Sequence, residues 1–230
     1  MSAGLVKSIV DSNKLLRFCK ENSDVGAKYE PLGPVDQLRM VCMFDAAFGV
    51  RRDSSSQGGY LIMLVPQATF DGEERPYHLL DWKSSKLPRI ARSSLGAESQ
   101  AAGQAVDAVD FCSRFWERML QPNLGLRQLL EASSSLKPVM ITDAKALYDS
   151  YHREGLGGNV TDKRTGLEIR VTKERLEGLQ GNFKWISSER QYTPMDSPKK
   201  LRGSFWRTGF AMEKPSSPGI LRTLQQRRRS

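Results

Sequence analysis

Two aspartates in this sequence each end an apolar run. The run in "RMVCMFDAAF" stops at Asp45, and the run in "VMITDAKALYDSY" stops at Asp143. Runs that are apolar throughout are typical of central strands, and the ligands of open α/β sheets collect outside the carboxyl ends of such strands. If the two strands are adjacent and parallel, the two carboxylates lie side by side. The plainer alternatives are a helix N-cap at Asp143 and a turn residue at Asp45.

A third carboxylate lies on the long helix that the sequence predicts from Ser93 or Ser94 to about Leu120. Steps of four and three residues trace a stripe that we expect to face the sheet. Its members are Glu98, Ala102, Ala105, Val109, Cys112, Trp116 and Met119. Glu98 is the charged member of this stripe, although a carboxylate near a helix N-terminus can simply complement the helix dipole.

Clustered carboxylates repel one another unless a cation neutralises them, and their hard oxygen ligands suit Mg²⁺ or Mn²⁺. Two such ions, about 4 Å apart, would activate a water and stabilise the leaving oxygen of a phosphodiester. Asp45, Glu98 and Asp143 together therefore favour metal-dependent phosphodiester chemistry over three unrelated structural roles.

The elements that must position these acids follow from hydrophobic periodicity. Strands are expected at 38–47, 60–66, 77–82, 136–143 and 182–187, and helices at 5–22, 93–120, 144–153 and 162–180. In the last helix, the stripe Leu167, Val171, Arg175 and Leu179 is spaced by fours. Strands in quick succession indicate antiparallel hairpins, and a strand after a long helix is usually parallel to its neighbour. The predicted fold class is therefore α/β, with three antiparallel strands, then parallel strands, in a mixed five-stranded sheet covered by helices.

Composition sets the expected organisation of the 230 residues. We predict an N-terminal helix and linker over 1–37, one domain over 38–188, and a basic, Pro/Ser-rich and largely disordered tail over 189–230. Three distant cysteines suggest neither a disulfide framework nor a zinc cluster. The sequence has neither a run long enough to span a membrane nor a clear secretion signal, so we expect a cytoplasmic or nuclear, non-secreted protein without a membrane partner.

The net charge of +9 favours a polyanionic partner, and nucleic acid is the commonest. The segment "KSSKLPRIAR" precedes the helix of Glu98 and could hold phosphates through Lys83, Lys86, Arg89 and Arg92. The alternative for this segment is a solvated basic loop, and the terminal "QQRRRS" inflates the charge without forming a site. We expect core positions, rather than base-stacking platforms, for Trp82, Trp116 and Trp185. No ligand role is assigned to His78 or His152.

Four segments, in order, resemble the ribonuclease H domain of copia-type retrotransposon Pol polyproteins. They are "FDAAFG", "GGYLIML", "LDWKSSKLPRIARSSLGAESQAA" and "VMITDAKALYDSY", and the resemblance covers roughly residues 8 to 200. It implies a ribonuclease H-like fold that cuts the RNA strand of RNA·DNA hybrids with two Mg²⁺ or Mn²⁺ ions and no small-molecule cofactor. Asp45, Glu98 and Asp143 match the catalytic, metal-binding acids of the family. The reverse transcriptase or integrase portions of a parent polyprotein are the implied protein partners.

Downstream, the sequence departs from the family pattern. Gly166 stands where a histidine is usual, Glu168 keeps a carboxylate, and Asp196 is the available match for the fourth acid, displaced by about two residues. Loss of one metal ligand would cost several kcal/mol of transition-state stabilisation, and each ~1.4 kcal/mol is tenfold in rate. The alternative function is therefore a degenerate retroelement relic that binds nucleic acid without cleaving it. A third possibility is a protein-interaction scaffold.

Overall fold

The computed structural model describes residues 6–23, 29–73, 75–131, 134–153 and 162–187. The chain divides into two compact units, Met1–Glu30 and Pro31–Ser230. The first holds helix α1 (Val6–Glu21), as the periodicity predicted. None of the helices in the described ranges combines the length and the hydropathy that crossing a bilayer requires. The predicted tail over 189–230, with Asp196, lies outside the described residues.

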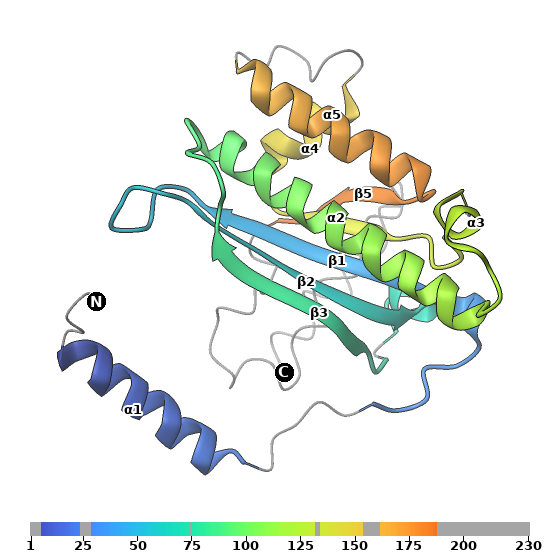
Figure 1. Ribbon diagram of the computed structural model, residues 1–230, viewed down its shortest axis with the longest axis horizontal. Coiled ribbons are helices and arrows are strands. Elements are labelled where there is room, and N and C mark those ends of the chain that lie inside the picture. Colours follow the sequence, from blue (N-terminus) through green and yellow to red (C-terminus); the bar gives the residue numbers. More distant parts are fainter. Residues whose placement is uncertain (1–5, 24–28, 74, 132–133, 154–161, 188–230) are drawn as a thin grey trace, which may run out of the picture. The chain divides into compact units, whose positions relative to one another are not determined.

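The second unit is built on a mixed five-stranded sheet in the order β3-β2-β1-β4-β5 (Figure 1). The strands are β1 (Leu38–Ala47), β2 (Gln57–Pro66), β3 (His78–Lys86), β4 (Val139–Thr142) and β5 (Asn182–Trp185). β1 and β3 pair antiparallel with β2, whereas β4 pairs parallel with both β1 and β5. The predicted fold class is confirmed.

Within the described residues, four α-helices accompany the sheet: α2 (Ser94–Leu120), α3 (Leu126–Glu131), α4 (Lys145–His152) and α5 (Lys163–Gly178). Two short 3₁₀ turns, η1 (Val35–Gln37) and η2 (Gln67–Asp71), flank the antiparallel strands. α2 begins where expected, because the Ser93 hydroxyl accepts a hydrogen bond from the Gly96 amide at 3.1 Å. The sequence did not predict α3, since six residues are too few to display a helical period.

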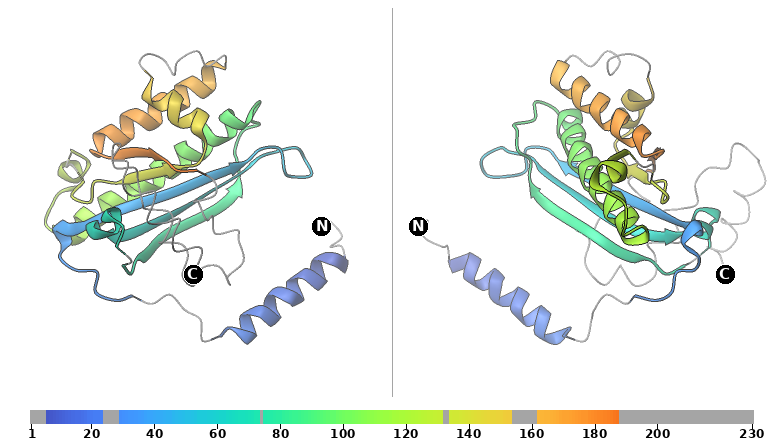
Figure 2. Two further views of the ribbon diagram at one scale, coloured as in Figure 1. Left: turned by 180° about the vertical axis from the view of Figure 1, so that it is seen from behind. Right: turned by 45° about the vertical axis from the view of Figure 1, so that its right-hand side comes forward.

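The strands bury residues on both faces of the sheet. Met40, Cys42 and Phe44 of β1 pack with the buried faces of α2, α4 and α5. Their neighbours Val41 and Met43 belong to a second cluster on the opposite face, which contains no α-helical residue within the described part of the chain. Seen from behind, the antiparallel strands lie in front of α2 (Figure 2). The all-apolar strand pattern thus reflects burial on two sides.

Two expected helix stripes differ from the buried ones. Met119 of α2 is 60% exposed, and Leu167 and Val171 of α5 are 56% and 46% exposed. A strict seven-residue repeat drifts by about 20° per heptad around a straight helix, so by Met119 the α2 stripe has turned away from the sheet. Steps of four drift further, and the residues buried along and just after α5 are Thr165, Gly166, Ile169, Thr172, Leu176 and Leu179.

The expectation of core positions for the tryptophans is wrong for two of them. Trp82 is 68% exposed and Trp185 is 37% exposed, whereas Trp116 is partly buried against the α2-side cluster. Trp82 lies on β3, an edge strand that has a strand neighbour on one side only, which explains its exposure. Residues 48–56 connect β1 and β2.

Candidate metal centre

The parallel pairing of β1 and β4 brings Asp45 and Asp143 together. Met43 is paired with Ile141, and each aspartate lies two residues beyond its member of this pair. Because β1 and β4 run parallel, the two aspartates lie at the same level along the strands, Asp45 near the end of β1 and Asp143 directly after β4. The adjacency that the sequence analysis required is therefore present.

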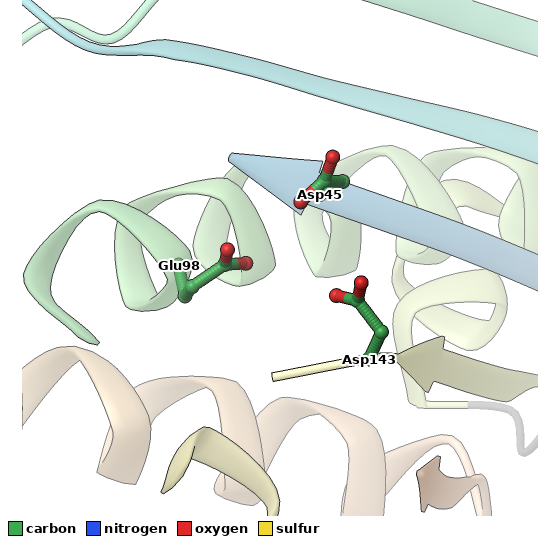
Figure 3. A group of neighbouring side chains, drawn as sticks. All are labelled: Asp45, Glu98 and Asp143. Carbon is green, nitrogen blue, oxygen red and sulfur yellow. The ribbon is translucent and has the colours of Figure 1, made fainter. Parts of the chain in front are cut away.

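Glu98 reaches the same place from α2. The Ser93 cap fixes the start of this helix, and Glu98 falls in its first turns, beside the ends of β1 and β4 (Figure 3). One carboxylate oxygen from each of Asp45, Glu98 and Asp143 lies within 4.8 Å of those of the other two. Figure 3 shows the three carboxyl groups directed toward one common space. The structure thus brings together the three acids that the sequence analysis grouped, while their catalytic role stays a prediction.

A pair of glycines allows β2 to approach this region closely. Gly59 is the β2 partner of Asp45, and Gly58 is the partner of Ala46. A Cβ at Gly58 would lie 2.5 Å from Cδ2 of the buried Leu87, in the connection that leads to α2. The "GG" pair therefore permits tight packing of the β3–α2 connection on the sheet, next to the helix turn that carries Glu98.

The structural alternatives for the two aspartates do not hold. The N-cap of α4 is Ala144, and this helix start has no side-chain cap hydrogen bond, so the Asp143 carboxylate is not a cap. Asp45 lies inside β1, which continues to Ala47, and is not in the turn that follows. Its Oδ1 accepts a hydrogen bond from the Ala46 amide at 2.7 Å. Glu98 is not a surface complement to the helix dipole either, because it is 9% exposed.

The electrostatics of the cluster favour a bound cation. Burial, and then the charges of Asp45 and Asp143, raise the pKa of Glu98 to about 8. Burial and the Asp143 charge also raise the pKa of Asp45. Oε2 of Glu98 is buried without a hydrogen-bond partner. A buried carboxylate oxygen that lacks a donor, beside two further carboxylates, matches the oxygen-rich ligand set of a hard divalent ion. The donor set therefore fits such an ion.

The four predicted phosphate-binding residues lie on β3 and on the connection that leads to α2. Lys83 and Lys86 are exposed on β3, and Arg89 and Arg92 belong to the connection, at residues 87–93. Two of them also form ion pairs: Lys86 Nζ lies 2.5 Å from Asp53 Oδ2, and Arg89 pairs with Glu168 of α5. The end of β3 is thus tied to the β1–β2 loop, and the connection is tied to α5 at Arg89.

Further cationic residues at this end of the sheet were not predicted. Arg51 and Arg52 are exposed in the β1–β2 loop, which begins just beyond Asp45. Arg164 of α5 lines a hollow together with Arg89 and Arg92 of the connection. Arg51 and Arg52 could have been found from the hairpin position, since the loop must lie beside the carboxyl end of β1. Arg164 could not, because its proximity depends on how α5 packs against α2.

No protein-family model and no curated protein matches this chain. Among solved structures, it is similar to ribonuclease H1 from the halophilic archaeon Halobacterium salinarum NRC-1, with 14% identity and a TM-score of 0.40 over 66% of this chain and 87% of that one. It is similar to LC11-RNase H1 in complex with an RNA/DNA hybrid, with 13% identity and a TM-score of 0.37 over 66% of this chain and 88% of that one. It is also similar to the RNase H domain of PFV, a foamy virus, with 15% identity and a TM-score of 0.36 over 73% of this chain and 88% of that one.

Proposed function

We propose that this chain is a metal-dependent nuclease of the ribonuclease H type, which hydrolyses the RNA strand of RNA·DNA hybrids. The observation that carries the proposal is the convergence of Asp45, Glu98 and Asp143 within 4.8 Å of one another, from three separate elements. A chance cluster of acids on a surface would be solvated. Here Glu98 is buried, and one of its oxygens has no hydrogen-bond donor.

In this function the three carboxylates hold Mg²⁺ or Mn²⁺, and two bound ions would activate a water and stabilise the leaving oxygen of the scissile phosphodiester. Glu98, whose pKa is about 8, is mostly protonated at neutral pH and must lose its proton to become a ligand. The chain's own residues thus contribute a buried anionic site whose negative charge the cation would neutralise.

The proposed substrate follows from the charges beside the site. The exposed Arg92 lies two residues before the start of α2, the helix that carries Glu98, and the exposed Lys83 lies on β3, opposite Tyr60 of β2. Arg51 and Arg52 lie in the loop beyond Asp45. An A-form-like hybrid is recognised through its shape, phosphates and 2′-hydroxyls rather than through its base edges. Cationic side chains can bind the phosphates of such a hybrid. These residues would hold the phosphates on either side of the cleaved bond.

A copia-type retrotransposon origin is part of the proposal and is supported by the four sequence segments described above. The reverse transcriptase or integrase portions of such a polyprotein would then be the protein partners. Asp196, the candidate fourth acid, lies outside the described residues, so the three convergent acids carry the proposal without it.

The test is cleavage of an end-labelled RNA·DNA hybrid by the full chain, with Mg²⁺ and separately with Mn²⁺. Cleavage of the RNA strand is expected for the wild type, and Asp143→Asn should remove it. The matched control is Asp36→Asn, since Asp36 is exposed before the opposite end of β1. Binding of hybrid without cleavage under both metals would support the alternative of a nucleic-acid-binding relic. Weak binding that does not depend on salt would instead favour a protein-interaction scaffold.

A further inference from the structure

We propose that Trp185 is a positioning residue for the metal centre, and that it acts by holding the backbone of Asp143. The indole Nε1–H donates a hydrogen bond to the Asp143 carbonyl oxygen at 2.9 Å. Trp185 itself is not among the clustered acids and contributes no ligand. This inference rests on the proposed function, because it assigns Trp185 a part in preparing the same carboxylate site.

Asp143 lies at a point where the regular hydrogen bonding of the sheet has ended. β4 ends at Thr142, which is paired with Trp185, the last residue of β5. One residue beyond the end of β5, the amide of Ile186 still donates a hydrogen bond to the Thr142 carbonyl oxygen at 3.0 Å. The Asp143 carbonyl has passed the end of the strand, and the Trp185 side chain supplies its donor. The indole hydrogen bond thus lets β5 hold the other chain segment one residue beyond the end of β4.

The opposite side of the same turn is held by Thr142. Its Oγ1 accepts a hydrogen bond from the Ala144 amide at 3.1 Å, and the residue is fully buried. The peptide group between Asp143 and Ala144 is therefore fixed at both its carbonyl and its amide. Fixing this plane limits the directions that the Cα–Cβ bond of Asp143 can take, and with them the position of its carboxylate. Metal-binding side chains held in advance in this way lose less entropy when the ion binds.

The exposure of Trp185 indicates that hydrophobic burial is not its main role. The side chain is 37% exposed, whereas Phe183, two residues earlier, is 4% exposed in the core. Lys145 Nζ lies 5.1 Å from the centroid of the indole ring and 3.6 Å from Asp149 Oδ1. Phenylalanine or tyrosine would keep an aromatic face for Lys145, but neither has a donor at the indole nitrogen. The hydrogen bond to Asp143 is thus the contribution that requires tryptophan.

The experiment compares Trp185→Phe with Trp82→Phe, which makes the same chemical change at an exposed tryptophan on the edge strand β3. The melting temperature of each full-length protein is measured against Mn²⁺ concentration at pH 8, without substrate. Trp82→Phe should bind Mn²⁺ as the wild type does. Trp185→Phe should need three- to tenfold more Mn²⁺ for half of the maximal shift, with a metal-free melting temperature within a few degrees of that of the wild type.

Each result bears on one claim. If the wild type is stabilised by Mn²⁺ and Trp185→Phe has the same half-saturating concentration, Trp185 does not position Asp143 and the metal site stands. If Mn²⁺ has no effect on the wild type, the metal centre itself is wrong and the inference falls with it. Should Trp185→Phe be too unstable to titrate, Trp185→Tyr is used, which keeps a polar ring but lacks the indole donor. The same loss of affinity is then expected, and wild-type affinity would again overturn the positioning role.

Discussion

One carboxylate oxygen of Glu98 lies within 4.8 Å of one of Asp45, and burial, together with the charges of Asp45 and Asp143, raises the pKa of Glu98 to about 8. Without a cation, the buried member of the pair is therefore neutral over most of the physiological range. This proton links the stability of the fold, the affinity for metal and the pH.

The first prediction concerns the stability of the metal-free protein. The ordinary pKa of glutamate is 4.5, and in the fold that of Glu98 is about 8, so between these values the folded state binds more protons than the unfolded state. Stability must then fall as pH rises through this window, and level off above it. Glu98→Gln should remove most of this fall and be more stable than the wild type at pH 8.5, by an amount on the order of a few kcal/mol.

Urea unfolding with EDTA, at pH 5.5 and pH 8.5, measures this effect. Asp36→Asn is the matched control, because this acid is exposed and far from the cluster along β1. It should follow the wild-type profile. If Glu98→Gln also follows that profile, Glu98 does not carry the proton.

The second prediction is that stabilisation by metal increases with pH. The ion competes with the proton on Glu98, so each pH unit below about 8 should weaken its apparent binding up to about tenfold. A fixed Mn²⁺ concentration should therefore raise the melting temperature more at pH 8.5 than at pH 6.5. Asp143→Asn should show little rise at either pH. An equal rise at both pH values in the wild type would contradict proton-linked binding.

The third prediction concerns the cationic residues. Replacing Lys83 or Arg92 with glutamine should weaken binding of an RNA·DNA hybrid and reduce the slope of log K against log salt by about one each. Lys137→Gln is the control, because this exposed lysine precedes β4, at the opposite end of the sheet from Asp143. Fluorescence anisotropy in EDTA over a range of salt concentrations gives both quantities. A slope that changes as much with Lys137→Gln would place the hybrid elsewhere.

The fourth prediction tests the packing below the site. A Cβ at Gly181 would lie 2.8 Å from the Pro138 carbonyl oxygen and 2.4 Å from Cδ1 of the buried Leu176. Gly181→Ala should therefore destabilise the fold by roughly 1–3 kcal/mol. In contrast, a Cβ at Gly103 in α2 meets nothing within 4 Å, so Gly103→Ala should stabilise it by about 0.5–1 kcal/mol. Urea unfolding should give opposite signs, and the same sign for both would contradict the packing account.

The fold class and the grouping of Asp45, Glu98 and Asp143 could be predicted from the sequence because the signals are local. Each aspartate ends an apolar run, and Glu98 breaks an apolar stripe. Parallel pairing of β1 and β4 then follows from the long helix between them.

Other features could not be predicted in this way. The burial of Ile169 in place of Leu167 depends on the angle at which α5 meets α2, which helical spacing does not specify. The exposure of Trp185 and its bond to the Asp143 carbonyl depend on where β4 and β5 end relative to each other. The sequence shows which chemistry a side chain can offer, whereas tertiary packing determines which group it contacts.

The pairing of Cys42 with Met140 joins parts of the chain that are far apart in sequence. Such a contact closes a long loop, and long loops cost more entropy and close late in folding. The carboxylates at 45 and 143 therefore meet only when β4 pairs with β1. A chain that stops before β4, for instance at a premature stop codon, could form the antiparallel hairpins but would lack the ion-binding capacity. Binding of Mn²⁺ would thus report that β4 has paired with β1.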